Sequence, residues 1–116
     1  MVDADRILDG RKVVVIDDHE DSVELFRVAL ELCGAEARGF ASAIDAEDAI
    51  LEDRPDAIVS DLDVRGGGIE QLLATARRLR IPALVLTGHA RQEDLARALA
   101  TGFDDYRVKP IEPMEL

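Results

Sequence analysis

The sequence predicts an α/β fold in which a parallel sheet is covered by helices on both faces. Three short apolar runs, VVVI (13–16), AIVS (57–60) and ALVL (83–86), show no alternation of polar and apolar residues. Such continuous apolarity is typical of strands buried on both sides. Segments with helical periodicity separate these runs, and strands that alternate with helices form parallel sheets. The 116 residues are enough for one domain of this kind.

Two further runs predict the edges of the sheet. EARGF (36–40) and DYRV (105–108) are short and more polar than the three apolar runs. Edge strands carry more polar and charged residues because one side faces water. We therefore expect five strands, with these two at the margins.

Four helices are expected between the strands, each with one apolar face. Ser42 can cap the second helix, and Gly34 and Gly102 mark the ends of the first and fourth. Pro113 suits the first turn of a fifth helix, which is incomplete at residue 116. Residues 1–10 are expected to form a lead-in segment, and residues 11–116 the domain. In chain order, the inward-facing positions are Val23, Phe26, Leu30 and Cys33; Ala46, Ala49 and Ile50; Ile69, Leu72, Leu73, Ala76 and Leu79; and Leu95, Ala98 and Leu99.

The charge balance restricts the partners of the domain. With 14 basic and 25 acidic residues, the formal charge is −11. This charge repels phosphate backbones and anionic lipid, so we expect neither direct nucleic-acid binding nor membrane binding. No apolar run approaches the roughly 20 residues that span a bilayer, and the polar N-terminus resembles no targeting peptide, which favours the cytoplasm. Cys33 is the only cysteine, so an internal disulfide is excluded and a packing role is expected.

Reactive side chains stand at the ends of the predicted strands. Asp17 and Asp18 follow the first run, Asp61 follows AIVS, Thr87 follows ALVL, and Lys109 follows DYRV. Ligands of open parallel sheets bind at the carboxyl ends of the strands, so these groups should converge in one cleft. Three carboxylates repel one another unless a cation neutralises them, and oxygen ligands suit Mg²⁺. A carboxylate can also act as a nucleophile, which makes Asp61 a candidate phosphoryl acceptor.

The motifs IDD (16–18), SDLD (60–63), VLTG (85–88) and YRVKP (106–110) together resemble the receiver domain of two-component response regulators. The resemblance covers about residues 11 to 113. It implies a flavodoxin-like, doubly wound sheet of five parallel strands in the order 2-1-3-4-5. It also implies phosphorelay signalling, in which Asp61 accepts a phosphoryl group from a sensor histidine kinase or a histidine phosphotransfer protein, without turnover as an enzyme.

The resemblance assigns further roles residue by residue. Asp18 would ligate Mg²⁺ directly, Asp17 through water, and Asp63 through its carbonyl, beside Asp61. Lys109 would pair with the acceptor carboxylate or its phosphate. Thr87 would move to bind the phosphoryl group and Tyr106 would turn inward behind it, which makes these two residues the switch. Asp63 and His89 would flank the phosphoryl group and tune its reaction rates.

Assembly and context are also expectations from the resemblance. The domain could be fused to, or act on, a separate output domain, and the LDG lead-in resembles receiver segments cut from hybrid histidine kinases or longer regulators. Homodimers could form through the fourth helix, the fifth strand and an exposed face left by the incomplete last helix.

Two other functions fit part of the sequence. Arg65 stands where receiver domains usually have proline, which leaves open an interaction module that is never phosphorylated. SDLDV also fits the D-x-D-x-[TV] signature of haloacid-dehalogenase-type phosphatases, although that motif normally lies near the N-terminus. His19 and His89 are interpreted as loop residues and not as metal ligands, because no His/Cys pattern accompanies them.

Overall fold

The computed structural model describes residues 10–61, 67–87 and 92–108, and its strands form one parallel sheet in the order β2-β1-β3-β4-β5. This is the order that the sequence resemblance implied, and the two polar strands lie at the edges as expected. In chain order the elements are β1 (Lys12–Ile16), α1 (Glu20–Leu32), β2 (Glu36–Phe40), α2 (Ala43–Glu52), β3 (Ala57–Asp61), α3 (Ile69–Arg78), β4 (Ala83–Thr87), α4 (Gln92–Thr101) and β5 (Asp105–Val108).

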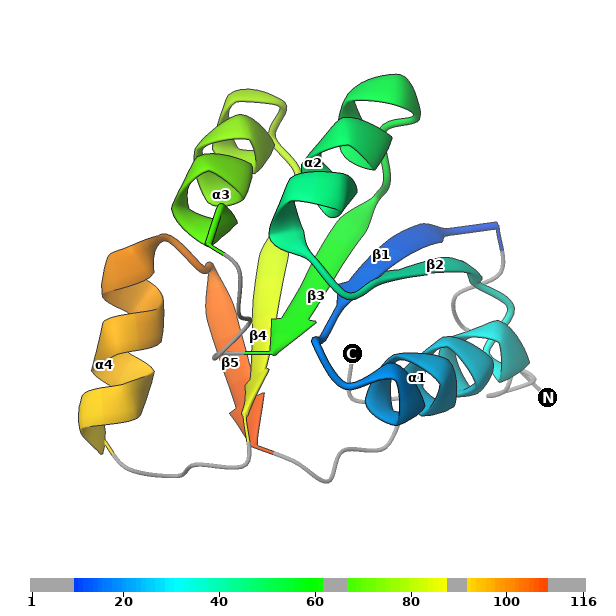
Figure 1. Ribbon diagram of the computed structural model, residues 1–116, viewed down its shortest axis with the longest axis horizontal. Coiled ribbons are helices and arrows are strands. Elements are labelled where there is room, and N and C mark those ends of the chain that lie inside the picture. The colour runs from blue at the N-terminus through cyan, green and yellow to red at the C-terminus, as the bar shows by residue number, and fades with distance from the viewer. Residues whose placement is uncertain (1–9, 62–66, 88–91, 109–116) are drawn as a thin grey trace, which may run out of the picture.

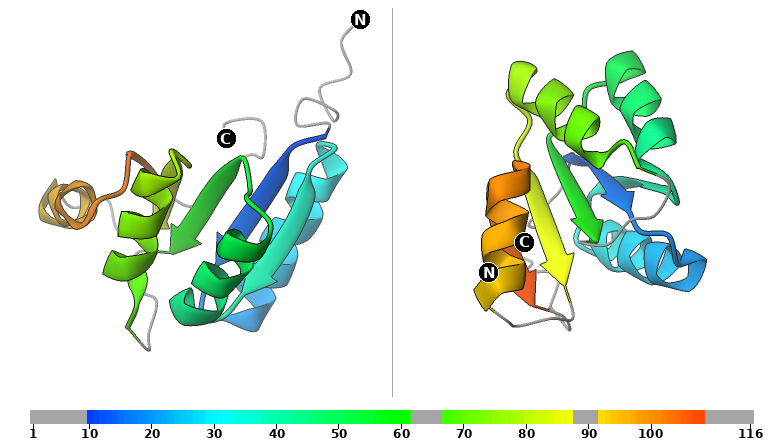
Figure 2. Two further views of the ribbon diagram at one scale, coloured as in Figure 1. Left: turned by 90° about the horizontal axis from the view of Figure 1, so that it is seen from above. Right: turned by 60° about the vertical axis from the view of Figure 1, so that its left-hand side comes forward.

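Helices cover both faces of the sheet, as Figures 1 and 2 show, with α1 on one face and α2 and α3 on the other. Two apolar clusters fill the spaces between these layers. The cluster on the α2 and α3 side is Val14, Ile16, Ala43, Ala46, Ile50, Ile58, Leu72, Leu73, Ala76, Ile81, Ala83, Val85, Ala98 and Phe103. The cluster on the α1 side is Val13, Val15, Leu30, Ala35, Ala37 and Val59. Because Ala98 belongs to the first cluster, α4 packs on the same side as α2 and α3.

Alternation along the strands explains the two clusters. Val13 and Val15 of β1 point to the α1 side, whereas Val14 and Ile16 point to the opposite side. Successive side chains of a strand point to opposite faces, so a strand buried on both sides must be apolar throughout. The apolar runs in the sequence are therefore the central strands.

The helix ends follow the sequence signals. The Ser42 side chain accepts hydrogen bonds from the backbone N–H groups of Ile44 and Asp45, at 3.1 and 3.3 Å, and so caps α2 as predicted. Gly34 follows α1 with a φ of 93°, a left-handed conformation that glycine adopts at little cost. Cys33 is buried beside it, in the packing role expected.

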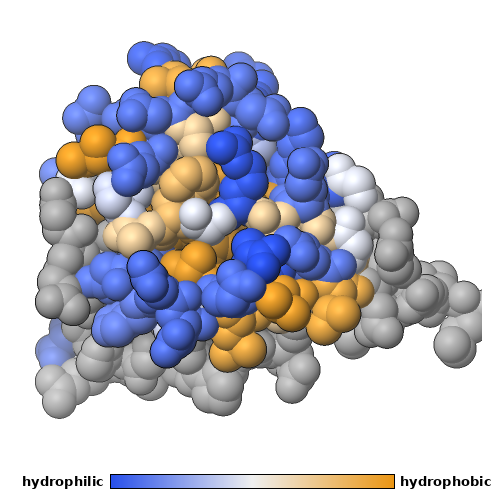
Figure 3. All heavy atoms as spheres, turned by 45° about the vertical axis from the view of Figure 1, so that its right-hand side comes forward, coloured by the Kyte–Doolittle hydropathy of each residue, from blue (hydrophilic) through white to orange (hydrophobic). Residues whose placement is uncertain are grey.

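Two helices carry exposed apolar residues, one at a position predicted to be buried and one on a face that the sequence did not assign. Leu99 of α4 was expected to face inward, yet it is 48% exposed while its neighbour Ala98 is fully buried. On α1, Leu25, Val28 and Leu32 form an outer apolar stripe of residues that are 73%, 41% and 67% exposed. Figure 3 shows apolar residues along the part of the surface where α1 lies. Residues 1–9 of the expected lead-in (1–10) and the whole of the expected last helix, around Pro113, lie outside the described residues.

None of the helices in the described ranges has the length and apolarity that a bilayer crossing requires.

Candidate functional site

The acidic pair at the end of β1 is held in place by the turn into α1. Asp17 is 5% exposed, and its N–H donates to the carbonyl of Phe40 at 3.1 Å, which continues the pairing of β1 with β2. Its Oδ1 accepts a hydrogen bond from the backbone N–H of His19 at 3.0 Å. An aspartate that binds the backbone two residues ahead forms a compact turn. The turn therefore fixes the Asp17 carboxylate before α1 begins at Glu20.

Asp61 lies beside this pair on the neighbouring strand. It is the last residue of β3, one position longer than the apolar run indicated, and it is partly exposed. Ile16 pairs with Ser60 in the parallel register of β1 and β3, so the next residues, Asp17 and Asp61, are at the same level. Paired residues of parallel strands point to the same face. Asp17 and Asp61 each lie two residues after a valine, Val15 or Val59, that packs on the α1 side. Both aspartates are therefore on the α1 face of the sheet.

His19 contacts the acidic pair, whereas the sequence was interpreted as placing it in a loop and not as a metal ligand. It is the N-cap residue of α1, and its ring is largely exposed. Nδ1 is 3.2 Å from Oδ1 of Asp17 and also 3.2 Å from Oδ1 of Asp18, an oxygen that is itself buried. Among the described residues, Asp17, Asp18 and His19 offer ligand atoms that all lie within 4.8 Å of one another. The only sequence signal for this contact is that His19 directly follows the acidic pair.

The site faces the N-terminus of α1. The first helical residues are Glu20 and Asp21, directly after His19. The N-terminus of a helix carries a partial positive charge from its unpaired N–H groups. The partial positive charge of this helix end therefore favours the carboxylates of the acidic pair that directly precedes it.

The other predicted site residues lie wholly or partly outside the described part of the chain. The backbone of Thr87 ends β4, one position beyond Leu86, the partner of Asp61, and it pairs with Val108 of β5. The backbone of Tyr106 lies in β5 opposite Val85. Asp63, His89 and Lys109 lie outside the described residues, as do the side chains of Thr87 and Tyr106. The register brings the ends of β1, β3 and β4 to one edge of the sheet, where these residues were expected to meet.

Comparisons with known proteins agree with this arrangement. The family model of the response regulator receiver domain matches residues 13–116. A 14.6 kDa protein of Leptolyngbya boryana, described by its position in the sodA1 3′ region, is 35% identical over 108 residues, which are 90% of this chain and 82% of that protein. The phosphate regulon transcriptional regulatory protein PhoB of Pseudomonas aeruginosa is 33% identical over 115 residues, which are 92% of this chain.

The chain spans about half of PhoB, 48% of its length. Among solved structures, the receiver domain of the Francisella response regulator 1452 superposes with a TM-score of 0.75 at 27% identity, covering 91% of this chain and 89% of that one. The phosphatase alternative loses its support, because the family match includes SDLDV within a receiver domain and not at the start of a dehalogenase-type domain.

Proposed function

Because the chain belongs to the family of response regulator receiver domains, we propose that Asp61 accepts a phosphoryl group and that its phosphorylation switches the conformation of the domain. The donor would be a sensor histidine kinase or a histidine phosphotransfer protein. One observation carries this proposal: Asp61 ends the central strand at the level of buried Asp17, while remaining partly exposed itself. A donor could reach Asp61, whereas Asp17 is shielded.

The carboxylates of the site suit a hard divalent cation. Carboxylate oxygens are the ligands that Mg²⁺ prefers, and grouped carboxylates gain from neutralisation. Asp17, Asp18 and Asp61 would hold the ion, with Asp63 as the further ligand that the family resemblance implies. The bound ion would supply charge neutralisation between the acidic residues and the phosphoryl oxygens.

The chemistry at Asp61 is a phosphoryl transfer between two side chains. A carboxylate oxygen of Asp61 forms a bond to phosphorus as the bond from phosphorus to the donor histidine nitrogen breaks, and that nitrogen keeps the electron pair. The product is an aspartyl phosphate. Asp17 contributes by its position, because its Oδ1 accepts a hydrogen bond from the His19 N–H at 3.0 Å, which holds the carboxylate in the turn.

The switch would use the residues that follow the neighbouring strands. Phosphorylation adds negative charge and three acceptor oxygens, which attract hydrogen-bond donors and cations. We propose that Thr87 and Lys109 bind the phosphoryl oxygens and that Tyr106 then turns inward. Asp63 and His89 would tune the rates of phosphorylation and hydrolysis. Since β4 ends at Thr87 and pairs with β5, a movement of Thr87 acts directly on the edge strand.

The cellular setting is part of the same proposal. PhoB is a transcriptional regulatory protein about twice as long as the matched segment, and by analogy the output here would come from a fused or separate domain. The formal charge of −11 disfavours direct binding of nucleic acid by this domain. We place it in the cytoplasm, as a signalling domain and not a turnover enzyme, and homodimers could form through α4 and β5, where Leu99 is exposed.

Incubation with Mg²⁺ and acetyl phosphate tests the proposal. We expect intact-mass spectrometry to show the addition of one phosphoryl group, which hydroxylamine removes because an acyl phosphate is labile to it. The Asp61→Asn variant should gain no mass, and chelation of Mg²⁺ should abolish the gain in the wild-type chain. A control variant, Asp56→Asn, alters an exposed aspartate just before β3 and should be phosphorylated normally.

Two results would contradict the proposal. An unmodified wild-type chain, folded by circular dichroism, would favour the interaction module that is never phosphorylated. Steady hydrolysis of a generic phosphomonoester that is lost in Asp61→Asn would indicate a phosphatase instead.

A further inference from the structure

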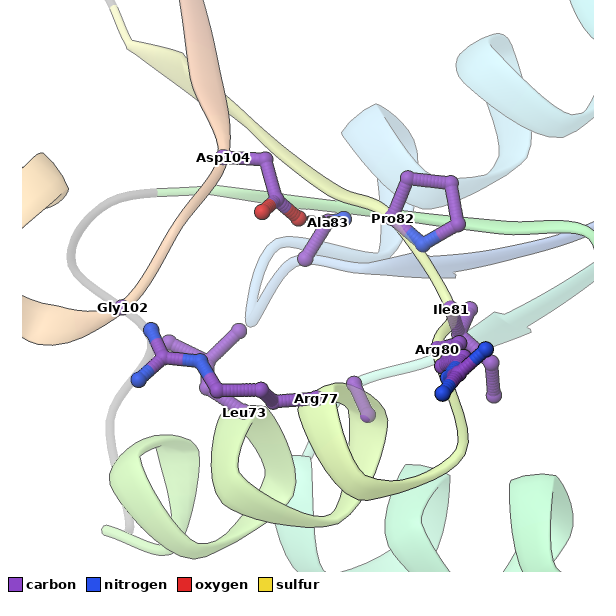
Figure 4. Close-up of a pocket in the computed structure, with 9 residues that line it drawn as sticks. Leu73, Arg77, Arg80, Ile81, Pro82, Ala83, Gly102 and Asp104 are labelled. Atoms are coloured by element: carbon purple, nitrogen blue, oxygen red, sulfur yellow. Dashed lines mark hydrogen bonds between the residues drawn. The ribbon is translucent and has the colours of Figure 1, made fainter.

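A cavity lies at the amino ends of β4 and β5, whereas the acidic site lies at the carboxyl ends of the strands. Its volume is about 280 Å³, and it lies between α3, the start of β4 and the segment that leads into β5. Leu73, Ala76, Ile81 and Ala83 form an apolar floor. Figure 4 shows Arg77 and Arg80 on opposite sides of the cavity, with the Arg77 guanidinium beside Gly102. Small-ligand sites combine an apolar lining with a few polar groups, and their volumes begin at about 300 Å³.

The charge of this cavity is opposite to that of the molecule. Its charged lining residues are Arg77, Arg80 and Asp104, a net positive set in a chain with a formal charge of −11. In the described part of the chain, no carboxylate lies within ion-pair distance of Arg77 or Arg80. Basic residues in the last turn of a helix stabilise its dipole, which would account for Arg77 and Arg78 alike. Arg77 nevertheless lines the cavity and Arg78 does not.

Asp104 is the acidic residue of the lining, and it is engaged by the backbone. Its Oδ2 accepts a hydrogen bond from the N–H of Ala83 at 2.7 Å, and its own N–H donates to the carbonyl of Ala83 at 2.8 Å. This pair of bonds joins the start of β4 to the segment before β5. The Asp104 carboxylate therefore has a structural partner, and the two guanidinium groups remain the donors that line the cavity.

Arg80 adopts a backbone conformation that favours glycine. Its φ is 59°, and it is the sole non-glycine residue with a positive φ among those that the structure describes. Gly34 and Gly102, which follow α1 and α4, occupy the same left-handed region. An L-residue is strained there, and such strain tends to persist at functional sites. Arg80 directly follows Leu79, the C-cap of α3, where helices commonly end in a left-handed glycine. Glycine would relieve the strain at this position, yet the chain has an arginine there, and its exposed side chain lines the cavity.

We propose that this cavity binds a small organic anion, in which a carboxylate or phosphate is attached to an apolar group of a few carbons. The oxyanion would lie in the cavity between two exposed arginine side chains, Arg77 at the Gly102 end and Arg80 at the opposite end (Figure 4), and each guanidinium group can pair with either kind of oxyanion through two parallel hydrogen bonds. The apolar part would contact Leu73, Ile81 and Ala83. The site is independent of Asp61 and of any cation at the acidic edge.

Binding of simple probes tests the proposal in the full chain with EDTA present. Benzoate and phenyl phosphate carry the two oxyanions on one apolar ring, benzyl alcohol carries the ring without the charge, and inorganic phosphate carries the charge without the ring. We expect saturable amide shifts at Ala83 and Gly102 in ¹H–¹⁵N spectra with benzoate, phenyl phosphate or both. Whichever of benzoate and phenyl phosphate binds more tightly identifies the preferred oxyanion. The neutral and inorganic probes should bind at least about fivefold more weakly, since each lacks one half of the recognition.

Three variants separate binding from stability. Arg77→Gln should lower the affinity for the preferred probe about fivefold or more. Arg78→Gln, which alters the neighbour in the same helical turn, should change that affinity by less than about twofold. Arg80→Gly should raise the melting temperature, because it relieves the left-handed strain, and yet weaken the probe about fivefold or more. Two results with the wild-type chain would overturn the proposal: amide shifts that are absent or do not saturate, and binding of benzyl alcohol or inorganic phosphate as tight as that of the preferred probe. Two results with the variants would also overturn it: equal effects of Arg77→Gln and Arg78→Gln, and wild-type affinity in Arg80→Gly.

Discussion

His19 adds an imidazole ring to a site whose other side chains are carboxylates. Its Nδ1 is 3.2 Å from one oxygen of Asp17 and 3.2 Å from one oxygen of Asp18. A ring N–H at this position donates to carboxylates that would otherwise repel each other. An imidazole nitrogen also suits borderline metals such as Zn²⁺, whereas Mg²⁺ favours oxygen. The same residue can therefore shift the metal preference of the site.

Replacement of His19 by alanine should lower Zn²⁺ affinity about tenfold or more without lowering Mg²⁺ affinity, because a nitrogen ligand matters only to the softer ion. Isothermal titration calorimetry of the metal-free protein with each ion measures both constants. His19→Asn keeps a polar group at the position but removes the imidazole, so it should lose Zn²⁺ affinity as well. An unchanged Zn²⁺ affinity in both variants would show that the ring is only a neighbour of the acidic pair.

The acidic pair could be predicted from the sequence, whereas the contact of His19 could not. Asp17 and Asp18 directly follow an apolar run, and the end of a parallel strand is a position that the run itself defines. The place of His19 depends on the turn that Asp17 Oδ1 forms with its N–H, and on the side-chain rotamer. Neither is encoded in the periodicity of the chain.

At the scale of elements, α1 carries two apolar faces with different roles. Leu30 is 1% exposed and packs in the cluster on the α1 side, whereas Leu32, two positions on, is 67% exposed. Residues two apart on a helix point in nearly opposite directions. The pair therefore offers a comparison in which residue type and helix are constant and only burial differs.

Truncation of these two leucines should have very different effects. Leu30→Ala should lower the free energy of unfolding by about 2–5 kcal/mol, because it leaves a cavity in a packed cluster. Leu32→Ala should change it by less than about 0.5 kcal/mol, because the side chain is already in water. Urea denaturation followed by circular dichroism gives both values. A loss of more than about 2 kcal/mol in Leu32→Ala would show that the outer stripe is covered in solution, for instance by a second copy.

Periodicity identified the inner face of α1 but could not assign the outer one. Val23, Phe26, Leu30 and Cys33 recur at helical spacing, yet Leu25, Val28 and Leu32 recur at the same spacing around the other side. In the inner set Leu30 and Cys33 are buried and Val23 and Phe26 are partly buried, because the sheet lies beneath them, and a sheet is a long-range feature. The exposed Leu99 has the same explanation: the pattern gives a face, and the neighbours decide whether it is covered.

At the scale of the whole molecule, the charge of −11 opposes compaction. Like charges on a folded surface repel one another, and the repulsion is weaker in the more expanded unfolded chain. Salt screens charges that lie more than about 10 Å apart at 0.1 M ionic strength. Stability should therefore depend on ionic strength across the molecule, apart from any specific ion site.

The melting temperature should rise between about 0.02 M and 0.3 M monovalent salt, because screening relieves this repulsion. Differential scanning calorimetry in NaCl and in choline chloride should give the same increase, since neither cation is selected by the carboxylates. A decrease with salt would contradict the expectation and would show that exposed ion pairs, such as Lys12 with Asp53 at 3.0 Å, outweigh the general repulsion. An increase in NaCl alone would point to a sodium site instead.

The strand order, through the family resemblance, the edge strands and the proximity of Asp17 to Asp61 could be predicted from the sequence, but the cavity at the other end of the strands could not. Arg77 and Arg80 read only as basic residues near the end of a helix. They flank a cavity because α3, the start of β4 and the segment before β5 meet there, and Asp104 ties two of these segments together. Such a meeting of distant segments leaves no local pattern in the chain.

One strand, β4, connects the cavity with the acidic site. β4 begins at Ala83, which lines the cavity, and ends at Thr87 beside the acidic edge, a distance of about 13 Å for five residues in extended conformation. Thermodynamic linkage makes any communication along it symmetrical. Whatever factor phosphorylation imposes on the affinity of the cavity for its anion, the anion must impose on the equilibrium of phosphorylation. A metabolite could then adjust the response of this domain without competing for Asp61.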